Sequence, residues 1–342
     1  MRPTFLFFVL IPLFFGLTTP TDALEIEDRA RFGVENGPEL RIISTADIGF
    51  FEPMILSFLT ANPAVSIDYV VASSTELMQA VSSGEQAFDL AISSAMDLQT
   101  KLANDGHALA HVSAATENLP GWAEWNNMLF AFTEEPAAIV VSKATFAGQP
   151  VPRTRHDLIE ALRKEPERFQ GRVGTYDVRQ SGLGYLFATQ DTRASETYWR
   201  LAEVMGALDV QLYCCSAEMI EDVKSGDLLI AYNVLGSYVS SRDDRAEFEI
   251  ILPSDFTTVM LRTALIPKNA ASPDLSREFI DHMLETVFSS GSEPLVHPSL
   301  GLPQVAAALN RIEIGPGLLV FLDQLKRRAF VREWENAILQ DQ

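Results

Sequence analysis

The chain has 342 residues, a formal net charge of −20 and 47% hydrophobic residues. The hydrophobic share excludes a wholly disordered chain, and the length predicts two domains that each bury a core. Because 46 acidic residues outnumber 26 basic ones, the composition argues against nucleic-acid binding and against attachment to an anionic membrane.

The first residues have the pattern of an export signal. Arg2 precedes an unbroken apolar run over 5–17, and small or polar residues follow as far as Ala23. This order is typical of a cleaved secretory signal peptide. A membrane anchor fits less well, because the run is shorter than the ~20 residues that span a bilayer and contains Pro12. We therefore predict cleavage after Ala23 and a periplasmic protein.

The remainder alternates between strand and helix patterns. A loose polar arm is predicted over 24–38, before the first strand at 40–43. Alternation of this kind predicts α/β architecture with mostly parallel sheets. The predicted helices are 52–60, 76–83, 96–104, 155–164, 181–188, 196–205, 217–224, 273–288, 302–309 and 318–335. The predicted strands are 66–71, 88–92, 172–176, 210–214 and 228–232, with further extended segments at 125–141, 250–252 and 259–266.

The extended segments near the middle and near residue 260 suit two passages between lobes. Two passages imply a hinge, and a cleft where the carboxyl ends of the strands of both lobes meet. We expect a two-lobed fold with a ligand cleft. Its parts are a signal peptide (1–23), a flexible arm (24–38), lobe 1 (39–132 plus 254–300), lobe 2 (133–253) and C-terminal helices that pack on the lobes (301–342).

Small hydroxyl residues recur where predicted strands end and helices begin. A helix N-terminus carries unpaired N–H groups and a partial positive charge, so several that converge can hold an anion without many cations. Ordinary helix capping is the alternative explanation for each residue taken alone. The candidate ligand contacts of this kind are Ser44, Thr45, Ser74, Ser94 and Ser181, and Gly182, which opens a helix with Ser181, is a further candidate.

The segment 175–185 adds an aromatic residue and a cation. Tyr176 ends a strand, and Arg179 stands just before Ser181-Gly182. A guanidinium there can grip an anion with two parallel hydrogen bonds. The alternative is a surface ion pair between Arg179 and Asp177.

Catalytic and metal-binding motifs are missing from the sequence. It has no GxSxG, HExxH, P-loop or CxxC motif. His107 and His111 have the i, i+4 spacing of a helical metal site, but Gly106 just before them interrupts any helix there. We therefore predict a protein that is not an enzyme and that holds neither a metal ion nor a cofactor. The adjacent Cys214 and Cys215 are either two half-buried thiols on a strand or a strained, redox-sensitive disulfide.

Three runs resemble those of a known family: DLAISSAMDLQTKLANDG from residue 89, GTYDVRQSGLGYLF from 174 and AYNVLGSYVSSR from 231. They resemble periplasmic substrate-binding proteins of ABC importers. More narrowly, they resemble the ferric-ion-binding-protein-like group, which also includes binders of phosphorylated sugars and a phosphoglycerate-sensing regulatory protein. The resemblance covers roughly residues 39–335 and implies the type II periplasmic-binding-protein fold.

The resemblance also implies a function. Ferric members use an adjacent tyrosine pair, whereas here Tyr232 and Tyr238 are separated, which is a poor set for a hard ferric ion. It thus implies capture of a small organic anion, phosphorylated or carboxylated, by hinged closure. Asn233 and Tyr238 join the candidate contacts, with Tyr176 as an aromatic wall. The expected partner of this monomer is an ABC permease; the alternatives are a membrane sensor kinase as partner, or a ferric-binding role.

Overall fold

The first lobe is built on a sheet that begins near the N-terminus of the described chain. The computed structural model describes residues 24–240, 242–288 and 308–340, so the predicted signal peptide lies outside the described residues. In sheet order the strands are β1 (Asp28–Gly33), β3 (Ser66–Val71), β2 (Glu39–Ser44), β4 (Leu90–Ser93), β14 (Thr263–Pro267), β7 (Leu129–Ala131) and β6 (Glu124–Trp125), with β5 (Ala108–Leu109) paired to β14. The central strands β2, β3 and β4 are parallel, and β14 returns antiparallel to β4.

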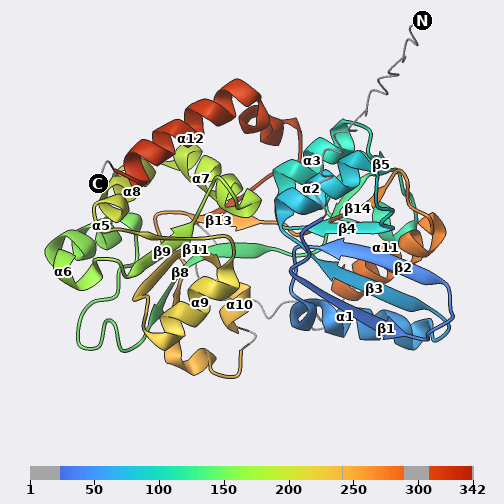
Figure 1. Cartoon of the computed structure of the whole chain (residues 1–342), viewed down its shortest axis with the longest axis horizontal. Coiled ribbons are helices and arrows are strands. Elements are labelled where there is room, and N and C mark those ends of the chain that lie inside the picture. The colour runs from blue at the N-terminus through green and yellow to red at the C-terminus, as the bar shows by residue number, and fades with distance from the viewer. Residues whose placement is uncertain (1–23, 241, 289–307, 341–342) are drawn as a thin grey trace, which may run out of the picture.

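Helices cover this sheet and connect its strands (Figure 1). Phe51, Met54 and Phe58 on one helix and Phe279 on another are fully buried against the sheet. These side chains recur every three or four residues, which is the spacing of one helical face. The helices are α1 (Ile48–Ala61), α2 (Ser74–Ser83), α3 (Met96–Asn104), α4 (Ala114–Glu117) and α11 (Pro273–Phe288).

Strand β1 corrects the expectation of a loose arm over 24–38. All six of its residues pair antiparallel with β3. Arg29 donates from Nε and Nη2 to the two carboxylate oxygens of Asp68, each at 2.7 Å. Asp68 is fully buried and needs such a partner. The partner strand is remote in sequence, so the polar composition of the arm gave no sign of the pairing.

The second lobe carries its own sheet. The strands in order are β10 (Gln211–Tyr213), β9 (Val173–Tyr176), β11 (Ile230–Leu235), β8 (Glu135–Ser142), β13 (Thr257–Met260) and β15 (Leu309–Arg311), with β12 (Phe248–Ile251) beside β8. β9, β10 and β11 are parallel, while β8 runs antiparallel to its neighbours β11, β12 and β13. The helices are α5 (Arg155–Lys164), α6 (Pro166–Phe169), α7 (Gly182–Ala194), α8 (Thr197–Gly206), α9 (Ser216–Ser225), α10 (Gly236–Ser240) and the 3-10 turn η1 (Arg245–Glu247).

The chain crosses between the lobes from β7 to β8 and from β13 to β14, which confirms the two predicted passages. The boundary near residue 254 is wrong, however. β13 pairs with β8 and β15 and so belongs to the second sheet, which moves the return passage to 260–263. Because α11 covers the first sheet and β15 joins the second, the chain passes between the lobes a third time.

A buried ion pair joins the two extended passages. Arg262 lies between β13 and β14, and its Nε donates to Oε1 of Glu135, at the start of β8, over 2.9 Å. Both side chains have no exposed surface. Glu135 also accepts hydrogen bonds from Thr133 (3.0 Å) and Ser237 (2.8 Å). The hinge is therefore fixed by a fully enclosed charge pair.

The C-terminal segment packs on the second lobe and also reaches the first. The predicted helix at 302–309 lies largely outside the described residues, and Leu309 begins β15 instead. The helix predicted over 318–335 is two elements, a 3-10 helix η3 (Pro316–Leu322) and α12 (Gln324–Ile338). They separate at Asp323, whose carboxylate caps α12. η3 packs against α3 of the first lobe, and α12 packs against α8. Among the described residues, no helix has the length and apolarity to cross a membrane.

Asp97, in the first turn of α3, is expected to make stability depend on pH. Its side chain is buried, and burial raises its pKa from 3.8 to about 7. The folded protein thus holds this proton more tightly than the unfolded chain, so stability is lost as pH rises from about 4 to about 7. At pH 8 the free energy of unfolding of Asp97→Asn should therefore exceed that of the parent protein by at least ~2 kcal/mol, with little difference at pH 4.

Urea unfolding of both proteins across this pH range measures the effect. Asp105→Asn, at the end of the same helix, is the control. The pKa of Asp105 is lowered, first by its hydrogen bond from Lys101, so its removal should be neutral or slightly destabilising at pH 8. Parallel stability curves for the parent protein and Asp97→Asn would contradict the prediction.

Candidate functional site

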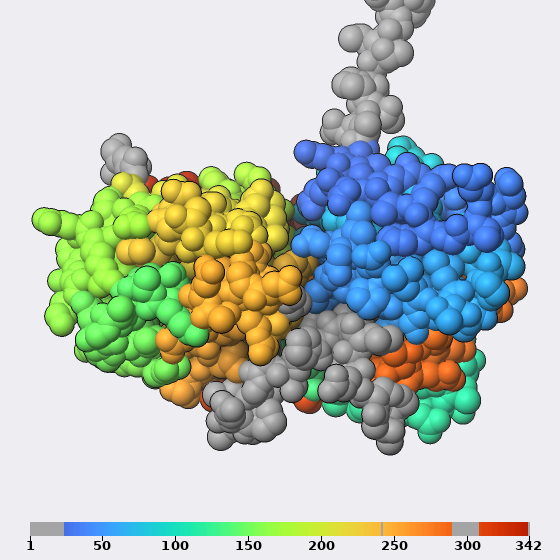
Figure 2. All heavy atoms as spheres, turned by 90° about the horizontal axis from the view of Figure 1, so that it is seen from below, coloured from blue at the N-terminus to red at the C-terminus, as the bar shows by residue number. Residues whose placement is uncertain are grey.

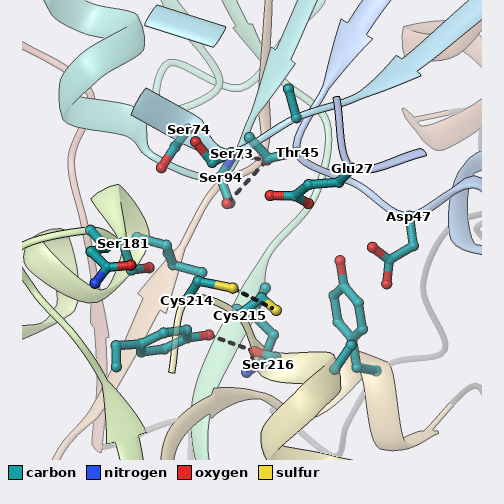
Figure 3. Close-up of a pocket in the computed structure, with 17 residues that line it drawn as sticks. Glu27, Thr45, Asp47, Ser73, Ser74, Ser94, Ser181, Cys214, Cys215 and Ser216 are labelled. Carbon is teal, nitrogen blue, oxygen red and sulfur yellow. Dashed lines mark hydrogen bonds between the residues drawn. The ribbon is translucent and has the colours of Figure 1, made fainter. Parts of the chain in front are cut away.

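A cavity of about 90 Å³ lies between the two lobes. It is smaller than the ~300–1,000 Å³ of pockets that hold drug-sized molecules, which favours a small ligand. Figure 3 shows the side chains of both lobes converging on it. The first lobe contributes Glu27, Thr45, Asp47, Ala72, Ser73, Ser74 and Ser94, and the second contributes Tyr176, Gln180, Ser181, Leu183, Cys214, Cys215, Ser216, Ala217, Leu235 and Tyr238.

The lobes touch on both sides of this cavity. On one side, the Gly182 N–H of α7 donates to Ser74 Oγ of α2 over 3.1 Å. On the other, the rings of Phe50 and Tyr238 stack with centroids 5.5 Å apart and planes within 6° of parallel. Figure 2 shows the two lobes as separate masses that lie side by side. The structure therefore has the lobes closed on each other.

Five helices begin at the cavity. α1, α2, α3, α7 and α9 each have at least 9 residues, and the lining includes a capping or adjoining residue of every one. The N–H groups of their first turns and the positive ends of their dipoles act on the same small volume. Convergence of this kind gives a cavity an affinity for negatively charged oxygens. The residues that mark these starts are Asp47, Ser73, Ser94, Ser181 and Cys215.

Some hydroxyls of the lining also serve as helix caps. Ser73 accepts a hydrogen bond from the N–H of Glu76 (3.2 Å), and Ser181 accepts one from the N–H of Gly184 (3.1 Å). Thr45 Oγ1 accepts from the Ser94 N–H over 3.1 Å. A hydroxyl that accepts in this way keeps its own hydrogen to donate. Capping and ligand binding are therefore compatible at these residues.

Among the described residues that line the cavity, only the carboxylates of Glu27 and Asp47 carry a full charge. Burial raises the pKa of Glu27, and the negative charges of Asp47 and Glu218 raise it further. Burial also raises the pKa of Asp47, while the nearby cation of Arg262 offsets part of the shift. Figure 3 shows both carboxylates at the cavity. They are acceptors suited to hydroxyl groups of a ligand.

The second lobe supplies two tyrosines, Tyr176, which is buried, and Tyr238, which is half-buried. The hydroxyl of Tyr176 lies 2.5 Å from Ser216 Oγ. Burial raises the pKa of both Tyr176 and Tyr238, so both side chains stay neutral phenols at physiological pH. Neutral phenols donate hydrogen bonds and provide flat apolar faces.

The structure brings six of the ten candidate contacts to the cavity and leaves the other four out of its lining. Ser44 turns into the backbone, where its Oγ accepts from the Ala46 N–H over 3.0 Å. Gly182 contacts Ser74 at the seam between the lobes. The six that line the cavity are Thr45, Ser74, Ser94, Tyr176, Ser181 and Tyr238.

Arg179 and Asn233 lie outside the lining because nearby acids engage them. Arg179 donates from Nε and Nη2 to Asp177 at 2.8 and 2.7 Å and lies over the ring of Trp334. The fork that could have gripped an anion is thus satisfied inside its own turn. Asn233 has a left-handed backbone (φ 62°) and donates from Nδ2 to the buried Asp191 over 2.8 Å.

The sequence reasoning missed several lining residues. Asp47 follows Ser44-Thr45 at the same strand end, so that pattern already pointed to it. Glu27 stands before β1, where no local pattern indicates a cavity. Gln180 and Ser216 flank predicted helix starts, and Cys214 and Cys215 were considered only as a pair of thiols.

Comparisons with known proteins agree with this geometry. A family model described as bacterial extracellular solute-binding protein matches residues 40–286. A solved substrate-binding protein of an ABC transporter from Agrobacterium tumefaciens is 32% identical, with a TM-score of 0.83 over 91% of this chain and 98% of that chain. No curated protein matches the chain.

Two further structures show the likeness in fold alone. One is the periplasmic binding protein AfuA from Actinobacillus pleuropneumoniae with fructose-6-phosphate bound, 14% identical, with a TM-score of 0.72 over 90% of this chain and 100% of that chain. The other is the apo ferric ion-binding protein A from Pasteurella haemolytica, 16% identical, with a TM-score of 0.67 over 89% of this chain and 99% of that chain. The two-lobed fold expected from the sequence is thereby confirmed. The chain belongs to the family of bacterial extracellular solute-binding proteins.

Proposed function

We propose that this solute-binding protein captures a small hydroxylated organic anion, such as a phosphorylated sugar or acid, for uptake through an ABC permease. The convergence of five helix N-termini on one closed cavity carries this proposal, because it provides N–H donors for an anionic group without a lining cation. The hydroxyls of Ser74, Ser94 and Ser181 add donors around the same group.

The two carboxylates give the ligand a second end. Glu27 and Asp47 repel a bare anion but accept hydrogen bonds from hydroxyl groups. A molecule that is anionic at one end and hydroxylated at the other satisfies both sets of groups. The fructose-6-phosphate bound to AfuA has this chemistry, and it supports the proposal by analogy of fold.

Delivery and location form part of the same proposal. The similarity to an ABC-transporter substrate-binding protein supports a permease as the partner of the closed form. The apolar run at the start of the chain supports export to the periplasm. A sensor kinase is the alternative partner. Ferric iron is the alternative cargo, which the following experiment tests.

Ligand identity is tested by thermal unfolding of stripped protein with fructose 6-phosphate, 3-phosphoglycerate, inorganic phosphate, citrate and ferric citrate. A ligand at 100 times its dissociation constant adds about 2.7 kcal/mol of stability and raises Tm by several degrees. We expect the largest rise with a hydroxylated phosphate. A rise with ferric citrate but not with citrate would replace the proposal by iron binding.

Glu27→Gln and Asp47→Asn then test the hydroxyl-accepting end. Each should weaken binding of fructose 6-phosphate by about 1.5–3 kcal/mol, the value of a hydrogen bond to a charged group, measured by calorimetry. Inorganic phosphate should bind as well or better, because a negative charge has been removed. Glu52→Gln, on α1 but outside the lining, is the control. Equal losses for both ligands would argue against the assigned role.

A further inference from the structure

The turn between β10 and α9 gathers three metal-ligating side chains at the edge of the cavity. The Sγ atoms of Cys214 and Cys215 lie 3.1 Å apart, and Cys214 Sγ lies 3.7 Å from Oε2 of Glu218. The ligand atoms of all three residues lie within 4.8 Å of one another. Both cysteines are free thiols and line the cavity, where Figure 3 shows their sulfurs side by side.

We propose that Cys214, Cys215 and Glu218 form a binding site for Zn²⁺. Zinc prefers thiolate and carboxylate ligands in tetrahedral geometry. Zn–S bonds of about 2.3 Å in that geometry place the two sulfurs ~3.8 Å apart, so a small side-chain rotation suffices. Three protein ligands leave a fourth position open toward the cavity. Binding displaces the thiol protons, which pass to solvent.

The local chain is arranged for chelation. All three donors come from five consecutive residues, so little chain entropy is lost when they meet around an ion. Cys215 is the N-cap of α9, and Glu218 lies in the first turn of that helix. Tyr213, just before the turn, hydrogen-bonds to Asp222 of the same helix over 2.5 Å, which holds the strand end against α9. Cys214 and Glu218 are exposed, so an ion can reach them.

The surrounding charge also favours a cation. The pKa of Glu27 is raised first by burial and then by the charges of Asp47, Glu218 and Glu25. Glu27 and Asp47 share the cavity with the thiol pair, and the described lining contains no Lys, Arg or His. A divalent ion bound by the turn would relieve this repulsion. The site goes beyond the proposed function and does not depend on it.

The test uses the purified, reduced and chelator-stripped protein. Zn²⁺ is titrated in competition with a chromophoric chelator, and Co²⁺ is added separately to detect thiolate-to-metal charge-transfer absorption. We expect one ion per chain. Cys214→Ser, Cys215→Ser and Glu218→Gln should each weaken zinc binding at least ~100-fold, since even outer-shell partners of metal ligands are worth 10–100-fold.

Glu221→Gln is the matched control. It removes the same charge from α9, but Glu221 pairs with Arg242, away from the thiols. Its zinc affinity should stay at the parent value. The absence of stoichiometric binding, or equal affinities for Glu218→Gln and Glu221→Gln, would overturn the site. A purified protein whose mass is two hydrogens below that of the dithiol form contains a disulfide between the two cysteines. If that protein also takes up no zinc after reduction, the pair belongs to redox chemistry instead. Fructose 6-phosphate binding, measured in the presence of chelator, reports separately on the proposed function.

Discussion

Replacing Arg262 by methionine is expected to destabilise the protein by about 3–5 kcal/mol, the cost of removing one partner from a buried ion pair. Glu135 would remain with no exposed surface and would keep the hydrogen bonds from Thr133 and Ser237, but it would lose the guanidinium of Arg262. A carboxylate without a compensating cation in such surroundings is strongly disfavoured. Urea unfolding at neutral pH measures the loss.

A neighbouring pair supplies the control. Arg311 pairs with Glu134, one residue before Glu135, but both of these side chains are partly exposed. Arg311→Met should therefore cost no more than about 1 kcal/mol, as exposed ion pairs do. Losses of equal size in the two variants would show that burial of the hinge pair is not the cause.

The double variant Arg262→Met with Glu135→Met separates charge from packing. Replacing both members of a buried pair by apolar side chains is often close to neutral, so the double variant should be more stable than Arg262→Met alone. If it were less stable by the sum of the two single losses, the two residues would not interact in the way the geometry indicates.

Local patterns in the sequence predicted most helices well. The helices at 96–104, 155–164 and 273–288 have the predicted bounds. The helix at 155–164 starts with a capping box in which Thr154 and Asp157 exchange hydrogen bonds, and a local signal of that kind needs no tertiary context. The extended run 259–266 was harder to assign, because it holds parts of β13 and β14, which lie in different sheets, and their composition does not indicate this.

In the candidate site, too, local patterns predicted some residues, while contacts between distant parts of the chain decided the rest. Ser74, Ser94 and Ser181 stand at helix starts, and the topology of the fold carries them to the cavity. Arg179 and Asn233 had suitable chemistry, but their partners decide where they point. Asp177 is close in sequence to Arg179 and was a visible competitor, whereas Asp191 is 41 and 42 residues from its partners Tyr232 and Asn233. Glu27 reaches the cavity only because β1 pairs with β3.

Gly182→Val is expected to hold the two lobes apart. A Cβ at this position would lie 2.4 Å from Ser74 Oγ, 3.1 Å from Ser74 Cβ and 3.0 Å from Leu98 Cδ1. These neighbours all belong to the first lobe, so rotation about the hinge relieves the clash without unfolding either lobe. The change in unfolding free energy should stay within about 1 kcal/mol, the range of helix propensities.

Opening the lobes removes the proposed site, because its groups come from both of them. The apparent dissociation constant rises in inverse proportion to the fraction of closed protein, so a closed fraction below about 1% weakens fructose 6-phosphate binding at least 100-fold. Small-angle scattering should show a larger radius of gyration for Gly182→Val than for the parent protein with ligand. Gly49→Val, on α1, where a Cβ meets no atom within 4 Å, should behave like the parent in both measurements. A Gly182→Val protein with parental affinity and radius would mean that closure at this seam is not required for binding, and the ligand would then have to be held by one lobe alone.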